Sequence, residues 1–596
     1  MSRISIIEKD LAGFTNSVID HKGAAVIKSS KGKNTPMLLQ SENDVIQKLG
    51  IPSAQYPDVF EILAYVRYAP IWVVSAIGEN ALFGGVDILS NNVVPFTIGR
   101  NENFTFNAIP TSIVETIDTG DGTTTEFTGT LSYFPIVYPQ NFKILLDTSE
   151  IPLTISETGI ITGSYITGSI NFTTGAYSLT FATAPGNEVD INCQYIYSAD
   201  KSSNISHSIM TTSPYKDDLA CIVKYISGSQ FELQLYRKTQ LGYSLIQTYK
   251  YSLIQEKDYF GRSLYYMDVF NDDPYVQIKV NTSFVGTYNL NITSQIDFAG
   301  GNRGEEPEAS DYQACWDYFK YANKYPARLF IDTTGNNAEY IKTIVTQYQT
   351  FSFGITTVPL GKTPAQAITY VSELEVSTDK MAIYHNWAKI KDNYNNSFAW
   401  VSLIGSVGGK FAQMVDKYLA DSPAGINEDG KYGGQLQDWT VVEMENDFTE
   451  NDLTNYYNAK INPIIFDPVY GVMVYGDQTL SPVWTDTSYI GARRVYDYIL
   501  EIVSKQILRK QEFKVNDQMH RLMAKVQIDN FIEPIKQSGW IRDYLVVCDE
   551  TNNNDIALQN REFIVDLYIQ IMPNSQWIKL RLTRVGQTIN INDLIA

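Results

Sequence analysis

The sequence has few of the residues that build metal sites and disulfides. Among its 596 residues there are four cysteines and four histidines. The cysteines form no Cys-x-x-Cys pair and the histidines no His-x-His or His-Glu-x-x-His pattern, so we expect neither a disulfide framework nor a metal site. Scattered cysteines of this kind fit a reducing compartment. We expect each histidine to be structural or at the surface. The cysteines are Cys193, Cys221, Cys315 and Cys548, and the histidines are His21, His207, His385 and His520.

Basic charge and long apolar runs are also scarce. There are 46 Lys and Arg residues against 66 Asp and Glu, which leaves a net charge of −20. Nucleic acid and anionic membranes would be repelled over most of such a surface, so neither is expected as a direct partner. The most apolar segment, APIWVVSAIG at residues 69–78, is about half the length that spans a bilayer and predicts a core strand. Glu8 and Asp10 interrupt the apolar stretch that a signal peptide requires.

A complete phosphate-binding loop is missing as well. The stretch GITTVPLGKTP, residues 354–364, ends in the Gly-Lys-Thr of such a loop, but Thr356 stands where the motif needs its first glycine. The apolar run FSFGITTVP predicts a buried strand, and TPAQAITYVSELE predicts a helix. No pattern of acid, base and nucleophile stands out elsewhere, so we expect a protein that is not an enzyme, without catalytic residues, cofactor or metal. A nucleotide-dependent enzyme built on Gly361, Lys362 and Thr363 is the rival hypothesis of a different class.

The sequence does contain alternating short patterns of strand and helix, enough for several domains. Its 44% apolar and 19% charged residues are typical of a globular protein, and its length exceeds that of a single core. A strand, two helices and a strand are predicted in residues 21–100, and strand–helix alternation resumes after the linker at residues 300–310. Between them, residues 101–200 alternate in short Thr- and Ile-rich runs that predict an all-β insertion. Within it, DTGDG at residues 118–122 predicts a hairpin turn rather than a calcium loop.

The last third of the chain carries its one sustained basic stretch. Two long helices are predicted there, at about residues 489–508 and 516–539, followed by strands in YLVVCD and REFIVDLYIQIM. The stretch is either a solvated helical face or a docking surface for an acidic partner. Its basic residues are Lys505, Arg509, Lys510, Lys514, Arg521 and Lys525.

Five segments of this region occur in an order that resembles a known family. They are YGDQTLS, YIGARRVYDYILEIV, FKVND, DYLVVCDETNNND and FIVDLYIQIMP. Together they resemble the contractile tail sheath protein of long-tailed, myovirus-type bacteriophages, densely over about residues 455–573. Weaker similarity occurs in ISIIEKD, KGKNTPMLLQSENDVIQKLG, DYFGRSLYYMDVFND and SPAG, whereas residues 101–200 do not match the common core.

The resemblance implies a mixed α/β, multidomain fold. An α/β core common to the sheath family would be built from N- and C-terminal parts of the chain, with inserted all-β domains and extended terminal arms. The expected division is an N-terminal arm at 1–20, the first part of the α/β core at 21–100, an inserted β-domain on the outer surface at 101–200, a β-rich layer at 201–299, an α/β domain at 300–480, the C-terminal sheath core at 481–573, and a C-terminal strand and arm at 574–596.

The resemblance also implies a function and its partners. Sheath subunits stack as hexameric rings around a tail tube in a metastable extended state, and contraction drives the tube through the host envelope for genome delivery. The implied partners are further copies of the chain, the tail tube protein, and the baseplate and tail terminator proteins, in the virion tail after assembly in the host cytoplasm. No nucleotide is used. The sheath of a phage-like contractile injection device is the alternative within the same class.

Both ends of the sequence carry strand patterns with one apolar face. An apolar strand face that nothing covers is an aggregation hazard, so we expect a partner for each. Both segments are therefore predicted to be inter-subunit arms that complete a sheet in adjacent subunits. The residues that point to this role are Ile4, Ile6, Leu11, Ile578, Leu580 and Leu582.

The tail tube is the acidic partner that the resemblance suggests for the basic stretch. A basic helix in a chain of net charge −20 suits an acidic partner surface. Exposed ion pairs of ~0–1 kcal/mol each are weak enough to break on contraction. The residues expected to face the tube are Lys505, Arg509, Lys510, Arg521 and Lys525.

Overall fold

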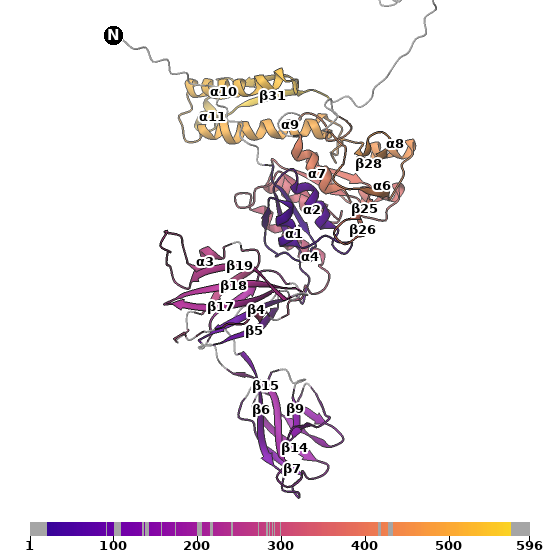
Figure 1. The fold of residues 1–596 in the computed structure, drawn as a ribbon. Helices are drawn as coiled ribbons and strands as arrows, with labels where there is room; N and C mark the ends of the chain where they lie inside the picture. Colours follow the sequence, from indigo (N-terminus) through magenta and orange to yellow (C-terminus); the bar gives the residue numbers. More distant parts are fainter. Residues whose placement is uncertain are drawn as a thin grey trace, which may run out of the picture. The chain divides into compact units, whose positions relative to one another are not determined.

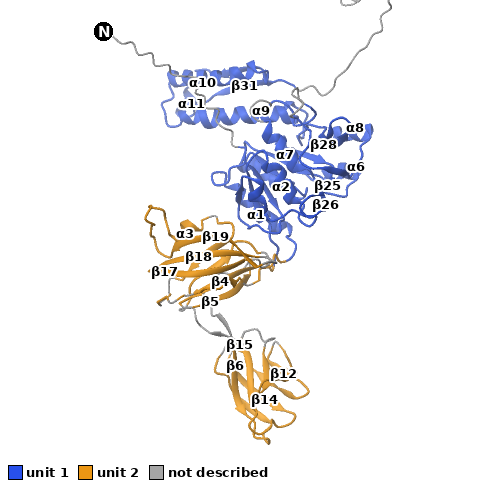
Figure 2. Ribbon diagram, viewed as in Figure 1, with its two compact units in different colours: residues 1–79, 305–596 blue, residues 80–304 orange. Residues whose placement is uncertain are grey.

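The computed structural model describes residues 21–573 with short gaps. The gaps are residues 91, 100–108, 134–135, 138–141, 157, 173, 200–204, 215–218, 240–241, 272, 282–283, 285–286, 289, 291, 299, 415–418 and 427–432. The chain divides into two compact units, residues 1–79 with 305–596 and residues 80–304 (Figure 2). The arm residues Ile4, Ile6, Leu11, Ile578, Leu580 and Leu582 lie outside the described residues, so their role stays a prediction.

The first unit is an α/β fold around an eight-stranded sheet, counted over the described residues (Figure 1). Its order is β2-β3-β1-β22-β23-β24-β28-β29, with parallel pairing from β3 to β28 and antiparallel strands at both edges. A smaller sheet has the order β26-β25-β27. The strands are β1 (Gly23–Ile27), β2 (Met37–Leu39), β3 (Ile71–Ser75), β22 (Leu329–Ile331), β23 (Phe353–Thr357), β24 (Met381–His385), β25 (Ala388–Asp392), β26 (Ser397–Val401), β27 (Val441–Met444), β28 (Ile461–Asp467) and β29 (Gly471–Val474).

Helices cover both faces of this sheet, and strand β1 shows why. Its sequence GAAVI is apolar throughout, as in a parallel strand that is buried on both sides. Ala25 and Ile27 enter one core and Ala24 and Val26 the other, because successive side chains point to opposite faces. The first core includes α1 (Glu42–Leu49), α2 (Asp58–Val66) and α7 (Ile404–Gln413), and the second includes α4 (Ala309–Trp316), α5 (Ala338–Thr343), α6 (Pro364–Glu373) and α8 (Glu450–Ala459).

The central sheet joins distant parts of the sequence. Gly23 of β1 pairs in parallel with Leu329 of β22, so residues 80–304 are an insertion between two halves of one sheet. The mixed α/β, multidomain fold predicted from the resemblance is therefore confirmed. Among the described helices, none is both long and apolar enough to cross a membrane.

Helix α7 is seated on α2 by a buried carboxylate and by glycine. Glu61 of α2 accepts hydrogen bonds from the backbone N–H groups of Leu403 (2.8 Å) and Gly405 (2.7 Å) and from the hydroxyl of Ser402 (3.0 Å). It thereby caps the first turn of α7, while burial raises the pKa of Glu61 to about 7. A Cβ atom at Gly405 would lie 2.0 Å from the backbone oxygen of Glu61, so this close approach requires glycine.

The first and last segments of the second unit together form two sheets that pack on each other. One has the order β20-β16-β4-β5 and the other β19-β18-β17-β21. Their core contains Val86, Ile209, Phe231 and Tyr251 among others. The elements are β4 (Leu82–Leu89), β5 (Val93–Gly99), β16 (Ile205–Thr211), β17 (Leu219–Ser227), β18 (Gln230–Thr239), β19 (Gly242–Ser252), α3 (Tyr266–Val269), β20 (Val276–Val280) and β21 (Ile296–Asp297).

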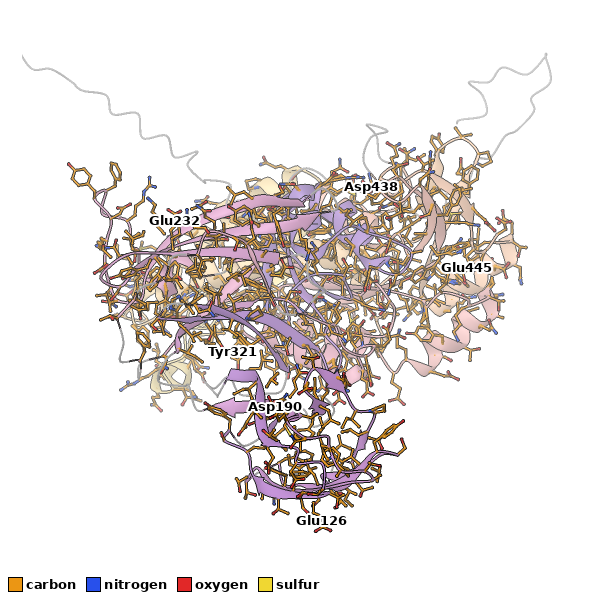
Figure 3. The ribbon with its side chains drawn as sticks, turned by 60° about the horizontal axis from the view of Figure 1, so that its bottom comes forward. Glu126, Asp190, Glu232, Tyr321, Asp438 and Glu445 are labelled. Carbon is orange, nitrogen blue, oxygen red and sulfur yellow. The ribbon has the colours of Figure 1, made fainter. Side chains whose placement is uncertain are left out.

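Residues 109–199 form a separate β-sandwich with its own core, which includes Phe127, Ile144, Leu179 and Tyr195. One sheet has the order β10-β9-β15-β6 with β8 added to β15, and the other β11-β12-β13-β14-β7. Figure 3 labels Glu126 on β7 and Asp190 on β15. The strands are β6 (Ile109–Thr119), β7 (Glu126–Thr130), β8 (Ile136–Val137), β9 (Lys143–Leu146), β10 (Ser149–Glu150), β11 (Thr154–Ile155), β12 (Ile160–Thr162), β13 (Ile166–Ile170), β14 (Ala176–Phe181) and β15 (Asp190–Ala199).

The hairpin turn predicted at residues 118–122 is wrong. Strand β6 pairs with β15 and β7 pairs with β14, so the segment crosses from one sheet to the other. Asp121 accepts hydrogen bonds from the backbone N–H groups of Thr123 (2.7 Å) and Thr124 (2.6 Å), and bonds from Thr124 and Thr123 lower the pKa of Asp121. Such Asp-centred turns serve hairpins and crossings alike, so local sequence does not distinguish them.

Candidate assembly surfaces

The last described part of the chain is a pair of helices packed on a two-stranded sheet (Figure 1). Its core contains Val495, Ile499, Ile528, Ile532 and Val546. The predicted helices and strands of this region are confirmed to within a few residues. The elements are α9 (Ile490–Glu501), a π-helical turn (Ile502–Ile507), a 3₁₀ turn (Leu508–Gln511), α10 (Gln518–Gln537), β30 (Ile541–Val547), α11 (Asp555–Gln559) and β31 (Asp566–Ile571).

The sheet of β30 and β31 is suited to accept another strand. The two strands pair antiparallel, and within the described part of the chain neither has a second neighbour. Leu545 and Tyr568 are partners in this ladder, and both are exposed. The outer edges of a two-stranded sheet carry N–H and C=O groups that a further strand can pair with. The sheet therefore has the geometry of an acceptor for a strand from another segment.

Three of the residues predicted to face a tube lie on the π-helical and 3₁₀ turns, and all three are exposed. Arg509 and Lys510 are on the 3₁₀ turn. The amino group of Lys505 lies 2.9 Å from the Glu501 carboxylate. Partial burial, followed by the charges of Arg328 and Arg509, lowers the pKa of Lys505. Because Lys505 already has an internal partner, Arg509 and Lys510 are the better placed of the three to reach another molecule.

The other two predicted residues lie on α10 and are less accessible. Arg521 is buried, and its guanidinium donates to the side-chain oxygen of Asn516 at 3.0 Å. Lys525 is half-buried. Because the guanidinium of Arg521 is held inside the subunit, it adds nothing to an exposed basic face. The tube-facing role of the remaining residues stays a prediction.

A buried charge network, which the sequence analysis did not identify, ties α9 to the central sheet. Arg493 donates from Nε to Asp497 at 3.0 Å and from Nη1 to Asp379 at 2.8 Å, and the amino group of Lys380 lies 3.5 Å from Asp497. Arg493, Asp497 and Glu501 are all more than nine-tenths buried. The sequence does indicate this network through the spacing of four residues between these side chains in YIGARRVYDYILEIV, because residues i and i+4 lie on the same helix face.

Two further arginines extend this attachment. Arg494 donates to the backbone carbonyls of Phe411 (3.0 Å) and Met414 (3.3 Å), at the C-terminal end of α7. A cation satisfies the last carbonyls of a helix and complements its dipole. Burial lowers the pKa of Arg494 to about 10, so the side chain stays charged at neutral pH. Arg328, next to β22, forms an ion pair with Glu501.

The segment GITTVPLGKTP is the strand, turn and helix predicted from its sequence. Thr356 is buried within β23. The side chains of Thr363 and Gln366 form a capping box at the start of α6. The backbone N–H of Gly361 donates to the carboxylate of Glu445, which Figure 3 labels and whose pKa is raised by burial. An internal carboxylate thus takes the N–H group that a phosphate would need.

Two of the histidines are buried structural groups. His207 Nε2 lies 2.7 Å from the Tyr251 hydroxyl, and His385 Nδ1 is hydrogen-bonded to the Tyr456 hydroxyl. Burial lowers the pKa of His207 to about 3 and that of His385 to about 4, so both are neutral at physiological pH. No cluster of three or more His, Cys, Asp or Glu side chains that could hold a metal ion occurs in the described part of the chain. The four cysteines are free thiols and are buried.

Comparison with known proteins finds relatives that align with 40% and 62% of this chain. No protein-family model matches the chain. The tail sheath protein of Vibrio phage KVP40 is 27% identical over 239 residues, which cover 40% of this chain and 34% of the relative. The tail sheath protein of Enterobacteria phage T4 is 22% identical over 400 residues, which cover 62% of this chain and 58% of the relative. The chain is related to phage tail sheath proteins.

The relation to tail sheath proteins of long-tailed phages confirms the resemblance found in the sequence. The chain spans between about a third and three-fifths of the length of these two relatives. A crystal structure of a sheath tail protein from Listeria innocua aligns with 93% of this chain and 92% of that chain, at a TM-score of 0.47 and 10% identity.

Proposed function

We propose that the chain is the structural subunit of a contractile phage tail sheath. The observation that carries this proposal is the 400-residue similarity to the tail sheath protein of phage T4. In this role the subunits polymerise as stacked hexameric rings around a tail tube, in a metastable extended state. Contraction then drives the tube through the host envelope for genome delivery. The work comes from free energy stored at assembly, so the subunit needs neither catalytic residues nor a nucleotide.

The β30–β31 sheet supports this proposal as an acceptor surface. A helical sheath is an open, head-to-tail array in which each subunit needs a donor and a distinct acceptor. Residues 1–20 and 574–596 would be the donors, and a 20-residue strand at ~3.3 Å per residue reaches roughly 60 Å. Backbone ladders contribute about 0.5–1.5 kcal/mol per hydrogen bond and require no particular side chain. Neighbouring subunits joined in this way can reorient without separating.

The proposal includes partners and a location. The subunit contacts further copies of itself, the tail tube, and the baseplate and tail terminator proteins at the two ends of the sheath, within the virion tail and, during assembly, in the host cytoplasm. In this role Arg509 and Lys510, which are both exposed, would face the tube. Direct contact with nucleic acid and insertion into a membrane are not part of this function, in keeping with the net charge of −20.

Negative-stain electron microscopy of the purified protein tests the proposal. We expect hollow tubes or striated sheaths that grow with protein concentration. A protein that stays monomeric alone, with tail tubes and with baseplates would contradict it. The genes beside the coding sequence distinguish a phage tail from an injection device, because only the phage needs capsid and terminase genes.

Substitution of Lys362 by Ala should leave sheath assembly and contraction unchanged. The turn that carries Lys362 already binds Glu445 through the N–H of Gly361, and β23 holds Thr356 where the phosphate loop requires glycine. Assembly is followed by microscopy and nucleotide hydrolysis by phosphate release, with the wild-type protein as control. Hydrolysis that is lost in the variant would establish the rival, nucleotide-dependent function.

Deletion of residues 109–199 should leave polymerisation intact, because the sandwich has a core of its own. We place this insertion on the outer surface of the sheath, where an addition disturbs no packing. Along β4, Leu82 pairs with Gly99 of β5 and Leu89 pairs with Ile205 of β16. Gly99 and Ile205, which the shortened chain must connect, are therefore about 23 Å apart along the strand at ~3.3 Å per residue. Residues 100–108 and 200–204 are therefore kept as the linker. A folded variant that forms no sheath would place the sandwich within the lattice instead.

A further inference from the structure

A cavity of about 80 Å³ lies between α9 and the central sheet of the first unit. Its wall is built from the first residues of β22 and β23, the C-terminal end of α7 and one face of α9. Phe351 and Tyr498 on this wall are only half-buried, so the cavity opens to solvent. It has room for a group of a few heavy atoms, whereas drug-sized ligands occupy pockets of ~300–1,000 Å³.

Arg494 places a buried cation on the wall of this cavity. The residue is more than nine-tenths buried. Its Nη2 donates to the backbone carbonyls of Phe411 and Met414, and its guanidinium carbon lies 5.2 Å from the centre of the Phe411 ring. Within the part of the chain that the structure describes, Nη1 is buried and has no hydrogen-bond partner. A donor on a buried ion is costly to leave without an acceptor, so this nitrogen requires one.

The carboxylates near the cavity do not neutralise Arg494. Asp421, whose charge acts on the guanidinium, is itself exposed to solvent. Asp497 lies on the cavity wall, but Arg493 and Lys380 already hold it. Over the described residues, Arg494 therefore lacks an ion-pair partner of its own.

The ionic network beside the cavity contains more cations than carboxylates. Counted over the described residues, its ion pairs join four cations to three carboxylates, and Arg494 is a fifth cation. Burial, followed by the charges of two arginines, lowers the pKa of one of the lysines. This local excess of positive charge, in a chain of net charge −20, favours an anion. The cations are Arg328, Lys380, Arg493, Arg494 and Lys505, and the carboxylates are Asp379, Asp497 and Glu501.

We propose that this cavity is a binding site for a small oxyanion, a carboxylate or a phosphate group, held by Arg494. The oxyanion accepts a charge-assisted hydrogen bond from Nη1 and supplies the negative charge that the network lacks. A planar guanidinium suits the oxygens of such groups better than it suits a single spherical ion. Because α9 and the central sheet both line the cavity, binding strengthens the attachment between them. The inference does not depend on the sheath function.

Calorimetric titration of the monomer with sodium phosphate and, separately, with sodium acetate tests this inference. Sodium chloride keeps the ionic strength constant, so that screening of surface charges does not change. Arg494→Met removes the cation and keeps an unbranched side chain. Ala412→Met keeps the cation and fills the cavity from α7 with a good helix former. The control is Arg262→Met, which makes the same chemical change at an exposed arginine of the second unit.

We expect the wild type and the control to bind one oxyanion per subunit with a saturable heat. Both site variants should bind at least tenfold more weakly, with unchanged circular dichroism. Tighter binding of acetate would identify a carboxylate as the natural group, and tighter binding of phosphate would identify a phosphate. If the wild type bound neither anion, or if Ala412→Met bound as tightly as the wild type, the inference would be overturned. Neither of these results bears on polymerisation, so the sheath function is tested separately.

Discussion

Removal of residues 1–20 or of residues 574–596 is expected to leave a folded monomer that forms neither tubes nor sheaths. The β30–β31 sheet is packed on the helices of its own domain, and within the described part of the chain its outer edges have no strand neighbour, so further strands can pair with it. In residues 578–582 apolar and basic side chains alternate, as in a strand with one buried face. Pro573 has no backbone N–H group to donate to a neighbouring strand, so we expect the subunit's own sheet to end before it. Each lost strand would remove several backbone hydrogen bonds at every contact between subunits.

A matched pair of triple variants separates the strand face from mere chain length. Ile578→Asn, Leu580→Asn and Leu582→Asn change the apolar face, and they should abolish polymerisation as the truncation does. Lys579→Asn, Arg581→Asn and Thr583→Asn change the other face of the same strand and should polymerise. Circular dichroism confirms that each monomer is folded, and sedimentation measures assembly. Normal sheaths from either truncation would show that other surfaces hold the lattice.

Arg493→Ala should destabilise the attachment of α9 to the central sheet by about 3–5 kcal/mol. The substitution leaves Asp497 more than nine-tenths buried, with Lys380 at 3.5 Å as its remaining partner in this network. An uncompensated buried charge costs far more than the intact pair contributes. Because a chain of several domains need not unfold in two states, the measurement is hydrogen exchange of the α9 amides. Protection there should fall by at least a hundredfold.

Two controls test the electrostatic explanation. Lys505→Ala removes an exposed charge from the same network and should cost less than about 1 kcal/mol. Arg493→Met with Asp497→Leu removes both charges of α9 from the network. It should recover part of the lost protection, because the ions that lose their α9 partners, Asp379 and Lys380, are more exposed than Asp497. If the double variant were as weakly protected as Arg493→Ala, packing rather than charge would account for the effect.

Much of the fold was predictable because many of its signals are local. The apolar run of β23, the capping residues of α6 and the helix periods of α9 and α10 each act within a few residues, and the structure has these elements where they were predicted. The absence of a complete phosphate-binding loop in this segment was equally predictable, because a single residue, Thr356, stands where the motif requires glycine. The five segments of the last third, which occur in the same order as in the family, were specific enough to predict the similarity to tail sheath proteins.

What the sequence analysis missed depends on contacts between distant residues. The same turn chemistry at Asp121 serves a hairpin or a crossing between sheets, and the pairing of β7 with β14 settles which it is. Arg521 has the sequence of a surface residue, but the packing of α10 on its neighbours buries it. Phe513, between the 3₁₀ turn and α10, has an exposed ring and a left-handed backbone, and no local sequence pattern predicts either. Local propensity specifies which elements form, whereas burial and strain depend on how those elements pack. That packing joins residues from about fifty positions apart, as in β7 and β14, to about three hundred, as in β1 and β22.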